Sequence, residues 1–458
     1  MIKAMMLKEK DLETFEERNN YVITVVGCGR MGLPTACLFA DTGFKVICFD
    51  SDPYVVNQIN KGESPFSEPK IDEYLKKNLK EGHLIATSDP KEAIPKSDIV
   101  AIIVNTPIDK KKNPDYSNLE TSCRNVGLNL KQGALVILAS TVSPSVTETL
   151  VKETLEKSSG MKVGVGFELA YSPIRATAGR VIKDITSYAR VVAAIDKQGL
   201  ASTKTVLQTI TKGELIEVKD LKTAEATKLF ENIYRDVNIA LANELASFCE
   251  KAGIDYMKAQ KAANTQPFCH LLKPGIVSGH IPKDPYLLIS EADNLSVKLK
   301  LMPIARRVND ETIKRGYNLI KDALRSCEKP LRRSCISVIG VSYRPNVKES
   351  KGSLVLDLVR LLKKGGVRVS VFDPYFTCDE LREMGYPAER TFAKTIEGAD
   401  CLVIAVGHSR FKRLSLRRIK VMMKRTAAIV DLAQIVNPVR AEKEGFVYRG
   451  LGRGVWSG

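Results

Sequence analysis

Three glycines follow a short apolar run at the spacing of a dinucleotide-binding loop. Residues 22–26, VITVV, predict a strand, and Gly27, Gly29 and Gly32 come directly after it in the segment GCGRMG. Gly27 permits a tight turn, Gly29 lets the backbone approach a pyrophosphate, and Gly32 lets the following helix pack on the strand. The pyrophosphate would lie at the positive end of that helix. The chemistry that this pattern predicts is hydride transfer with a dinucleotide.

A carboxylate stands at the expected distance beyond the glycines. Asp50 comes 18 residues after the last of them, where it can accept hydrogen bonds from a ribose 2′-hydroxyl and would repel a 2′-phosphate. NAD is therefore predicted rather than NADP. The other predicted cofactor contacts are Arg30 and Met31 in the loop, and Thr106 and Thr141 after later strands. The alternatives are a purely structural glycine turn in a flavodoxin-like domain and ordinary loop threonines.

A second candidate site is a row of polar residues further along the chain. Lys228, Asn232, Arg235 and Asn243 lie at offsets of 0, 4, 7 and 15 residues, which put them on one face of a helix. Apolar residues make the same helix hydrophobic around much of its girth: Leu229, Ile233, Ile239, Leu241 and Leu245. A polar row on such a helix indicates an occupied site, and a solvated face is the alternative.

The elements that must position these residues alternate between strand and helix. Short β-branched runs predict strands buried on both faces of a parallel sheet, and they are residues 22–26, 45–49, 99–104, 134–139, 162–167 and 190–194. Residues 222–253 and 285–328 predict helix. A second α/β unit begins at residue 334, with strands at 367–372, 401–405 and 428–432. The predicted fold is α/β, with two Rossmann-like doubly wound parallel-sheet domains joined by a helical core. The predicted domains are 1–212, 213–329 and 330–458.

Composition limits the class of protein. The 458 residues carry a formal charge of +17, with 44% hydrophobic and 27% charged residues, as in an ordinary globular protein. The excess charge permits a nucleic-acid partner, but no nucleic-acid motif accompanies it, and a phosphate-rich small substrate is the better interpretation. The ten cysteines show no metal-binding spacing and predict reduced thiols. We expect a cytoplasmic protein without a signal peptide, membrane span or metal.

Several segments together resemble the UDP-glucose/GDP-mannose dehydrogenase family of nucleotide-sugar 6-dehydrogenases. The resemblance runs from about residue 22 to 436 and rests on the segments GCGRMG (27–32), STV (140–142), EATKLFEN (225–232), PKDPY (282–286), GVSYRPN (340–346) and FDP (372–374). The Tyr-Ser-Pro and GHIPKDP contexts are most similar to the branch that acts on UDP-N-acetylhexosamines, of the ManNAc and GalNAc types.

The resemblance implies a reaction and roles for particular residues. Such enzymes oxidise the C6 alcohol of a UDP-sugar to a uronate with two NAD, in the synthesis of polysaccharide precursors. The implied catalytic residues are Thr141, Lys228, Asn232 and Asp284. The implied substrate contacts are Arg235, His280, Tyr343 and Lys351, of which Lys351 stands where the family has an arginine. The family also implies a homodimer, or a higher homo-oligomer, built on the central helix.

Two residues of the family's second oxidation step are absent. The family reads Gly-His-Cys-Ile-Pro where this chain reads Gly279-His-Ile-Pro282, so the thiol that captures the aldehyde is missing. The family's glutamate is replaced by Ile174, and Ala178 offers no substitute. Cys269 could supply another thiol, and His280 could act as an acid or base.

The expected activity is therefore an NAD-dependent oxidation at C6 whose second step is in question. The alternatives are an aldehyde-forming or epimerising two-electron enzyme, and a catalytically silent protein that binds a nucleotide sugar.

Overall fold

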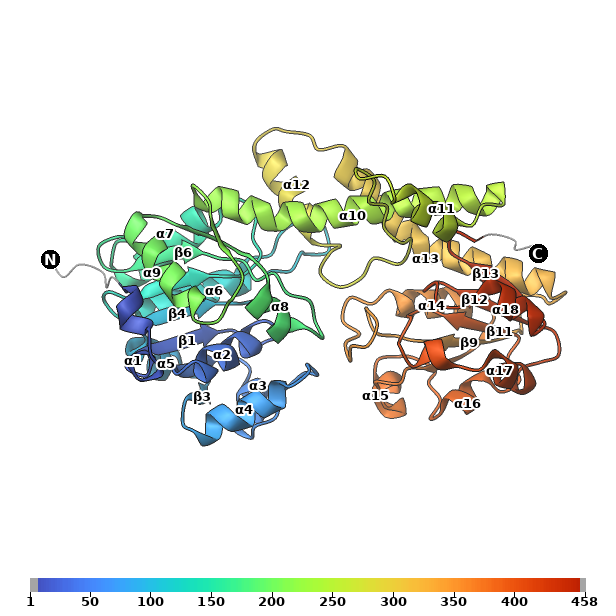
Figure 1. Ribbon diagram of the computed structural model, residues 1–458, viewed down its shortest axis with the longest axis horizontal. Helices are drawn as coiled ribbons and strands as arrows, with labels where there is room; N and C mark the ends of the chain where they lie inside the picture. Colours follow the sequence, from blue (N-terminus) through green and yellow to red (C-terminus); the bar gives the residue numbers. More distant parts are fainter. Residues whose placement is uncertain (1–6, 454–458) are drawn as a thin grey trace. The chain divides into compact units, whose positions relative to one another are not determined.

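The computed structural model describes residues 7–453, and the chain divides into two compact units. Unit 1 comprises residues 1–231 and 283–298, and unit 2 comprises residues 232–282 and 299–458. Each unit contains one sheet (Figure 1). Helix α10, Leu221–Ala252, begins in unit 1 and continues into unit 2. Within residues 7–453 no helix has the length and apolar character that crossing a membrane requires.

Unit 1 is built on an eight-stranded sheet with the order β3-β2-β1-β4-β5-β6-β7-β8. Its strands are β1 Val22–Val26, β2 Lys45–Phe49, β3 Leu84–Thr87, β4 Ile99–Ile102, β5 Leu135–Leu138, β6 Glu168–Tyr171, β7 Arg190–Ala194 and β8 Leu215–Glu217. Neighbours pair in parallel except β6 and β7, which are antiparallel. The strand order reverses between β1 and β4, which is where ligands of such sheets bind, beyond the carboxyl ends of the strands.

Both faces of this sheet are buried by helices. Side chains alternate along β1, so Ile23 and Val25 join one apolar core while Val22 and Val26 join the other. The helices and turns of unit 1 besides α10 are 3₁₀ turns Glu9–Leu12 and Ile94–Lys96, π turn Thr147–Val151, α1 Phe15–Arg18, α2 Gly32–Asp41, α3 Pro53–Asn60, α4 Ile71–Lys80, α5 Pro90–Ala93, α6 Ser117–Asn129, α7 Lys152–Ser159, α8 Val181–Ser187, α9 Lys197–Gln208 and α12 Asp284–Asn294. Burial on both faces explains why the strands are nearly continuous apolar runs.

Unit 2 contains a five-stranded parallel sheet with the order β10-β9-β11-β12-β13. Its strands are β9 Cys335–Ile339, β10 Arg368–Phe372, β11 Cys401–Ile404, β12 Ala427–Asp431 and β13 Phe446–Gly450. Its helices besides α10 are α11 Tyr256–Ala263, α13 Leu301–Ser326, α14 Val355–Lys364, α15 Cys378–Glu383, α16 Phe392–Ile396, α17 Leu416–Met422 and α18 Pro438–Lys443, with a 3₁₀ turn at Phe411–Arg413. Two apolar cores again cover the two faces of the sheet.

The predicted fold class is confirmed, with corrections to individual elements. The predicted strand at 162–167 is wrong: this glycine-containing segment turns, with Lys162 O accepting hydrogen bonds from the N–H groups of Val165 and Gly166, and the strand follows at β6. The predicted helix at 285–328 is two helices, because the chain breaks between α12 and α13, where Ser296 has φ +59°. Strands β3, β8 and β13 were not predicted.

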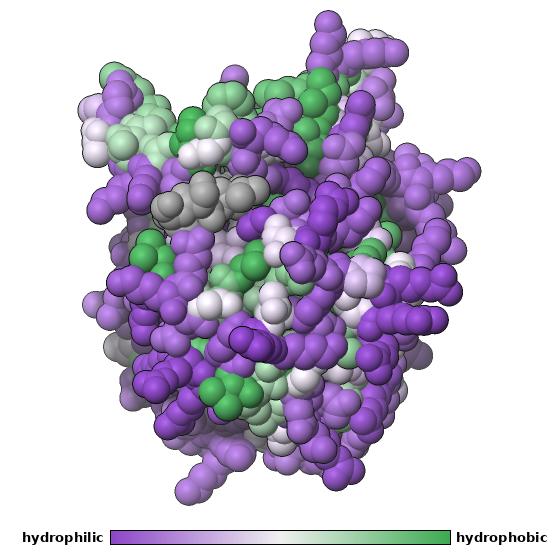
Figure 2. All heavy atoms as spheres, turned by 90° about the vertical axis from the view of Figure 1, so that its right-hand side faces the viewer, coloured by the Kyte–Doolittle hydropathy of each residue, from purple (hydrophilic) through white to green (hydrophobic). Residues whose placement is uncertain are grey.

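Basic residues are concentrated in one stretch of unit 2. The chain between Asp400 and Asp431 holds arginines and lysines but no acidic residue. Most of these basic side chains, on and around α17, are exposed. Seen from the side on which α18 lies, hydrophilic residues cover most of the surface, and the larger apolar groups lie at the top of the view (Figure 2). Such a surface fits solvation of the excess charge.

Candidate active site

The glycine loop of unit 1 has the geometry that a dinucleotide needs. Gly27 has φ +91°, and a Cβ there would lie 2.6 Å from Ile103 O. A Cβ at Gly32, the first residue of α2, would lie 1.8 Å from Gly27 O. At Gly29, in contrast, a Cβ would meet no atom within 4 Å. Packing therefore demands glycine at two positions, and open space at the third leaves room for a pyrophosphate to approach the backbone.

The other predicted cofactor residues surround the carboxyl ends of β1, β2 and β4. Asp50 Oδ2 accepts a hydrogen bond from Cys28 N–H at 2.7 Å, which fixes the carboxylate beside the glycine loop. Each oxygen of a carboxylate has two lone pairs, so a ribose hydroxyl can still bind. Arg30 Nη1 donates to Ser67 O at 3.1 Å, and Met31 immediately precedes α2.

The threonine loop after β5 is tied to its neighbours by hydroxyl groups. Thr106 Oγ1 donates to Thr141 O at 2.5 Å. Ser143 Oγ lies 2.7 Å from the Tyr116 hydroxyl and 2.8 Å from Leu287 O, to which it donates. These contacts join the loop that carries Thr141 to α12, the helix that begins at Asp284.

Lys228 lies within a cluster of charged side chains in unit 1. Burial lowers its pKa, and the cations Arg175 and Lys283 act in the same direction. The carboxylates of Glu231 and Asp284 oppose this and raise the pKa. Asp284 is only 1% exposed, and Lys283 Nζ lies 2.9 Å from its Oδ1. Lys228 and Asp284, which are 56 residues apart, are therefore brought into one electrostatic environment.

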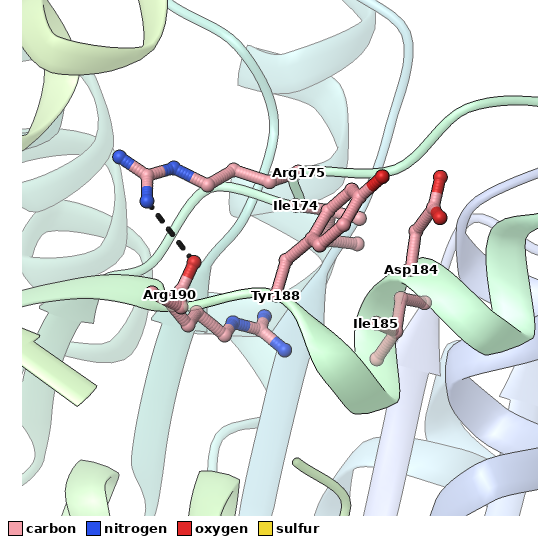
Figure 3. A pocket seen from close by; sticks show the side chains of 7 residues that line it. Ile174, Arg175, Asp184, Ile185, Tyr188 and Arg190 are labelled. Carbon is pink, nitrogen blue, oxygen red and sulfur yellow. Dashed lines mark hydrogen bonds between the residues drawn. The ribbon is translucent and has the colours of Figure 1, made fainter. Parts of the chain in front are cut away.

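Arg175 anchors the outer side of this cluster. Its guanidinium lies 2.5 Å from Glu231 Oε1, and its Nη1 donates to Ala189 O at 3.0 Å (Figure 3). Glu231 is three residues after Lys228 on α10, so the two side chains are neighbours on the helix. Ile174, the residue before Arg175, is 7% exposed and belongs to the apolar core of unit 1.

A buried carboxylate connects α10 to the threonine loop. Glu225 is fully buried and accepts hydrogen bonds from Ser145 N–H at 2.6 Å, Thr147 N–H at 2.8 Å and Thr147 Oγ1 at 2.5 Å. Burial raises its pKa to about 7, and the three donated hydrogen bonds oppose that rise. The backbone N–H groups of Ser145 and Thr147, at the start of the turn Thr147–Val151, thus find their hydrogen-bond acceptor on another helix, α10.

The three domains of one enzyme family match the chain in order. The NAD binding domain of the UDP-glucose/GDP-mannose dehydrogenase family matches residues 21–211, the central domain residues 222–311, and the UDP binding domain residues 337–438. The chain belongs to the UDP-glucose/GDP-mannose dehydrogenase family. This family match confirms three predictions: a nucleotide-sugar dehydrogenase family, an NAD-dependent enzyme, and NAD as the cofactor.

Similar proteins from this family act on N-acetylated sugars. UDP-N-acetyl-D-mannosamine dehydrogenase from Pyrococcus horikoshii is 35% identical over 94% of the chain and 99% of that protein. A solved structure of the UDP-D-ManNAc dehydrogenase from Pyrococcus horikoshii has a TM-score of 0.87 at 34% identity and covers 95% of the chain and 100% of its own. The NDP-N-acetyl-D-galactosaminuronic acid dehydrogenase from Methanosarcina mazei has a TM-score of 0.79 at 31% identity, covering 98% of each chain.

The predicted substrate residues of this family member all lie in unit 2. Three influences act on the pKa of the Arg235 guanidinium. Loss of solvent and the like charge of Arg344 lower this pKa, and Tyr343 raises it. A Cβ at Gly279 would lie 2.8 Å from the Tyr343 ring, and Gly279 N–H donates to Gly352 O at 3.2 Å. His280 and Lys351 are the chain neighbours of those two glycines, so the four predicted residues gather in one region.

Asn232 and Asn243, two further residues of the polar row on α10, have different surroundings. Asn232, one helical turn after Lys228, is grouped with unit 2. Asn243 serves the packing of unit 2: it exchanges hydrogen bonds with Gly275 and donates to Asn309 Oδ1 at 2.9 Å. The helical spacing of the polar row therefore extends beyond the residues that could share one site, and Asn243 lies outside that group.

The cysteines of unit 1 do not supply a reactive thiolate. Cys28, Cys37, Cys48 and Cys123 are all buried. Burial raises the pKa of Cys123 to about 12, and a thiol must ionise to act as a nucleophile. Cys269 belongs to unit 2, where its Sγ donates to Asn264 Oδ1 at 3.6 Å.

Sequence reasoning missed four side chains of the unit 1 site. Arg175, Glu231 and Lys283 flank Lys228, and Tyr171 ends β6 with a buried hydroxyl that has no hydrogen-bond partner among residues 7–453. A signal existed for Glu231, because it follows Lys228 by three residues. The place of Arg175 depends on the fold of the segment after β6, which the sequence pattern does not determine.

Proposed function

We propose that this family member oxidises the C6 hydroxyl of a UDP-N-acetylhexosamine with NAD, in the synthesis of glycan precursors. The observation that carries the proposal is that Lys228 and Asp284 share one environment within the same unit as the glycine loop. The N-acetylated sugars in the names of the relatives favour an N-acetylhexosamine over glucose or mannose.

In the proposed first step, two residues manage the charge and the proton of the sugar hydroxyl. Lys228 in its cationic form stabilises the negative charge that develops on the oxygen at C6. Asp284 accepts the hydroxyl proton, directly or through a water held at Thr141. NAD supplies the hydride acceptor. Lys283 and Glu231, flanking this pair, keep the site close to charge balance.

We assign the recognition of the nucleotide to unit 2. Arg235, Lys351 and the neighbouring Arg344 offer positive charge to the diphosphate, and Tyr343 offers an aromatic face. His280 lies next to this group through Gly279. Lys351 supplies a point charge without the fork of an arginine, so its contact with phosphate is less directional.

We further propose that the second oxidation is impaired. A thioester route needs a thiolate near the aldehyde and a carboxylate to assist hydrolysis. The chain has no cysteine beside His280, and Ile174 places an apolar side chain where a carboxylate would be required. Two outcomes remain chemically open: release or hydration of the aldehyde followed by reoxidation, and transient oxidation that leads to an epimer.

The deciding experiment counts NADH formed for each sugar consumed. The purified protein is incubated with NAD and a panel of UDP-hexoses and UDP-N-acetylhexosamines, and the products are identified by mass. We expect turnover with an N-acetylhexosamine and fewer than two NADH for each sugar. Two NADH with a uronate product would show that the second oxidation proceeds, through another thiol or through the hydrated aldehyde, and that the proposed impairment is wrong. Tight nucleotide binding without turnover would favour the silent binding protein.

We also infer a homodimer that uses α10. In unit 2 this helix exposes Tyr234, Leu241 and Phe248 at intervals of seven residues, with 56%, 43% and 63% of each residue exposed. An apolar row with this spacing suits packing against another helix. A second copy of the chain is the occupant that the expected oligomer provides.

Two further expectations stay proposals. We place domain boundaries at 1–212, 213–329 and 330–458. We also propose a cytoplasmic location, because none of the ten cysteines forms a disulfide and seven of them are buried.

A further inference from the structure

A buried glutamate joins two loops of unit 1 that are distant in the sequence. Glu68 lies in the loop between α3 and α4, residues 61–70, and is 6% exposed. Its Oε2 accepts a hydrogen bond from Gly179 N–H at 2.6 Å, and its Oε1 accepts one from Val181 N–H at 2.8 Å. Gly179 lies in the segment between β6 and α8, residues 172–180, and Val181 begins α8. Each oxygen of the carboxylate thus receives a charge-assisted hydrogen bond, which is stronger than one between neutral groups.

The loop that contains Glu68 also contacts the glycine loop. Arg30, within the segment GCGRMG, donates from Nη1 to Ser67 O at 3.1 Å, and its guanidinium carbon lies 5.2 Å from the centre of the Phe66 ring. That distance permits a cation–π interaction. Phe66 packs against the same apolar core as Val181. The residues that hold Arg30 therefore directly precede the glutamate that holds the start of α8.

The segment between β6 and α8 leads on to the lysine cluster. Residues 172–180 form neither helix nor strand, so the position of this segment depends on its contacts with other elements. Glu68 provides one such contact at the end of the segment. Arg175, in its middle, lies 2.5 Å from Glu231 Oε1, and Glu231 acts electrostatically on Lys228. The placement of this segment therefore determines whether Arg175 reaches the neighbour of Lys228.

We propose that Glu68 is a positioning residue through which NAD binding orders the segment between β6 and α8. Arg30 is a predicted cofactor contact, so a bound pyrophosphate restricts its motion, and Arg30 in turn restricts the loop that contains Glu68. Glu68 then stays in place and holds Gly179 and Val181. Because linkage between two sites is reciprocal, order in the segment also favours NAD binding. The proposal depends on NAD binding and not on the identity of the sugar or on the second oxidation.

Amide hydrogen exchange of the intact chain, followed by mass spectrometry with and without saturating NAD, measures this coupling. Local opening exposes the N–H groups of Gly179 and Val181 to solvent, so their exchange rates report how often the contact with Glu68 breaks. We expect NAD to slow both rates by about tenfold in the native protein. In Glu68→Gln the side-chain nitrogen is a donor and cannot accept the second N–H group, so NAD should slow exchange by less than about twofold.

Glu63→Gln is the matched control for this measurement. Glu63 lies in the same loop and is exposed, so its variant removes the same charge without touching the two N–H groups, and it should behave like the native protein. Phe66→Leu covers the case in which Glu68→Gln does not fold, because it weakens the contact with Arg30 and leaves the carboxylate intact. The slowing by NAD should then also decrease. No slowing in the native protein, or slowing as large in Glu68→Gln or Phe66→Leu as in the native protein, would overturn the proposal.

Calorimetric titration with NAD tests the reciprocal effect and needs no sugar substrate. Glu68→Gln should weaken NAD binding by about fivefold. If Arg30 and Glu68 act through one connection, the double variant with Arg30→Met should lose at least about threefold less affinity than the product of the two single losses. An unchanged NAD affinity in Glu68→Gln, or single losses that simply multiply, would contradict the coupling. Neither measurement involves turnover, so a failure of the proposed sugar oxidation would leave this result unaffected.

Discussion

The protonation of Lys228 is set by opposing influences from named neighbours. Burial, Arg175 and Lys283 lower its pKa, while Glu231 and Asp284 raise it. A lysine that stabilises a developing alkoxide must keep its proton over the working pH range. Glu231 therefore acts on the reaction through Lys228 and is a positioning residue rather than a catalytic one.

Neutralising Glu231 should change the pH dependence of the enzyme in a defined direction. In Glu231→Gln, Lys228 loses a neighbour that favours its charged form, so its pKa falls and it deprotonates at lower pH. The basic limb of the kcat/KM profile should move to lower pH, measured by NADH formation with the best UDP-sugar. Glu231→Asp keeps the charge and should largely restore the profile.

An unmoved profile in Glu231→Gln would contradict this electrostatic role. Arg175→Met provides a test of opposite sign, because Arg175 lowers the pKa of Lys228. The basic limb should then move to higher pH. A purely structural role of the Arg175–Glu231 pair would alter activity in both variants without moving the limb in opposite directions.

At the scale of elements, Glu225 joins the helix of Lys228 to the loop of Thr141. It lies on α10 one turn before Lys228 and accepts from Ser145 and Thr147, shortly after Thr141. Ser143 links the same loop to α12 through Leu287 O. Three elements that carry proposed catalytic residues therefore meet through short polar contacts, and loosening one contact should misplace the others.

Glu225→Gln should lower both stability and kcat. The amide keeps only one acceptor oxygen, so at least one buried N–H group of the loop loses its partner, at a cost of about 1–3 kcal/mol. The loss should appear in urea unfolding, together with a fall in kcat greater than any change in the affinity for NAD. Thr149→Val, which removes a hydroxyl that bonds only within its own turn, is the control.

The same variant tests the titration of Glu225. Its folded pKa, raised to about 7, exceeds the usual value of 4.5, so the unfolded chain ionises first as pH rises. The native free energy of unfolding should fall between about pH 4.5 and 7, by on the order of 3 kcal/mol from this group. Glu225→Gln should lack that slope, and an identical slope in both proteins would exclude the assignment.

Local sequence predicted the elements that are buried on both sides and failed where tertiary context decides. Strands β1, β2 and β7 have the predicted bounds because β-branched runs mark a doubly covered sheet. Edge strand β3, with Ile85 more than half exposed, lacks that signal. The break at Ser296 was missed because SVKLKL continues a pattern compatible with helix.

The candidate site likewise combines features that local sequence predicts with features that only the tertiary structure determines. The glycine loop and Asp50 were predictable because their spacing follows from the geometry of one βαβ unit. The neighbourhood of Lys228 was not, since Arg175 and Lys283 come from segments more than 50 residues away on either side. No local pattern specifies which charges will surround a buried lysine, although they determine its pKa.

At the scale of the whole molecule, the proposed dimer rests on the exposed row Tyr234, Leu241 and Phe248. Leu241→Glu places a charge at the centre of this row and should weaken the dimer by about 100-fold or more, because a buried unpaired charge is strongly unfavourable. Ser247→Glu adds the same charge about 120° around the helix and should leave association unchanged. Sedimentation velocity at micromolar concentration distinguishes these cases. A monomeric native protein, or a Leu241→Glu variant as dimeric as Ser247→Glu, would show that the row serves another purpose.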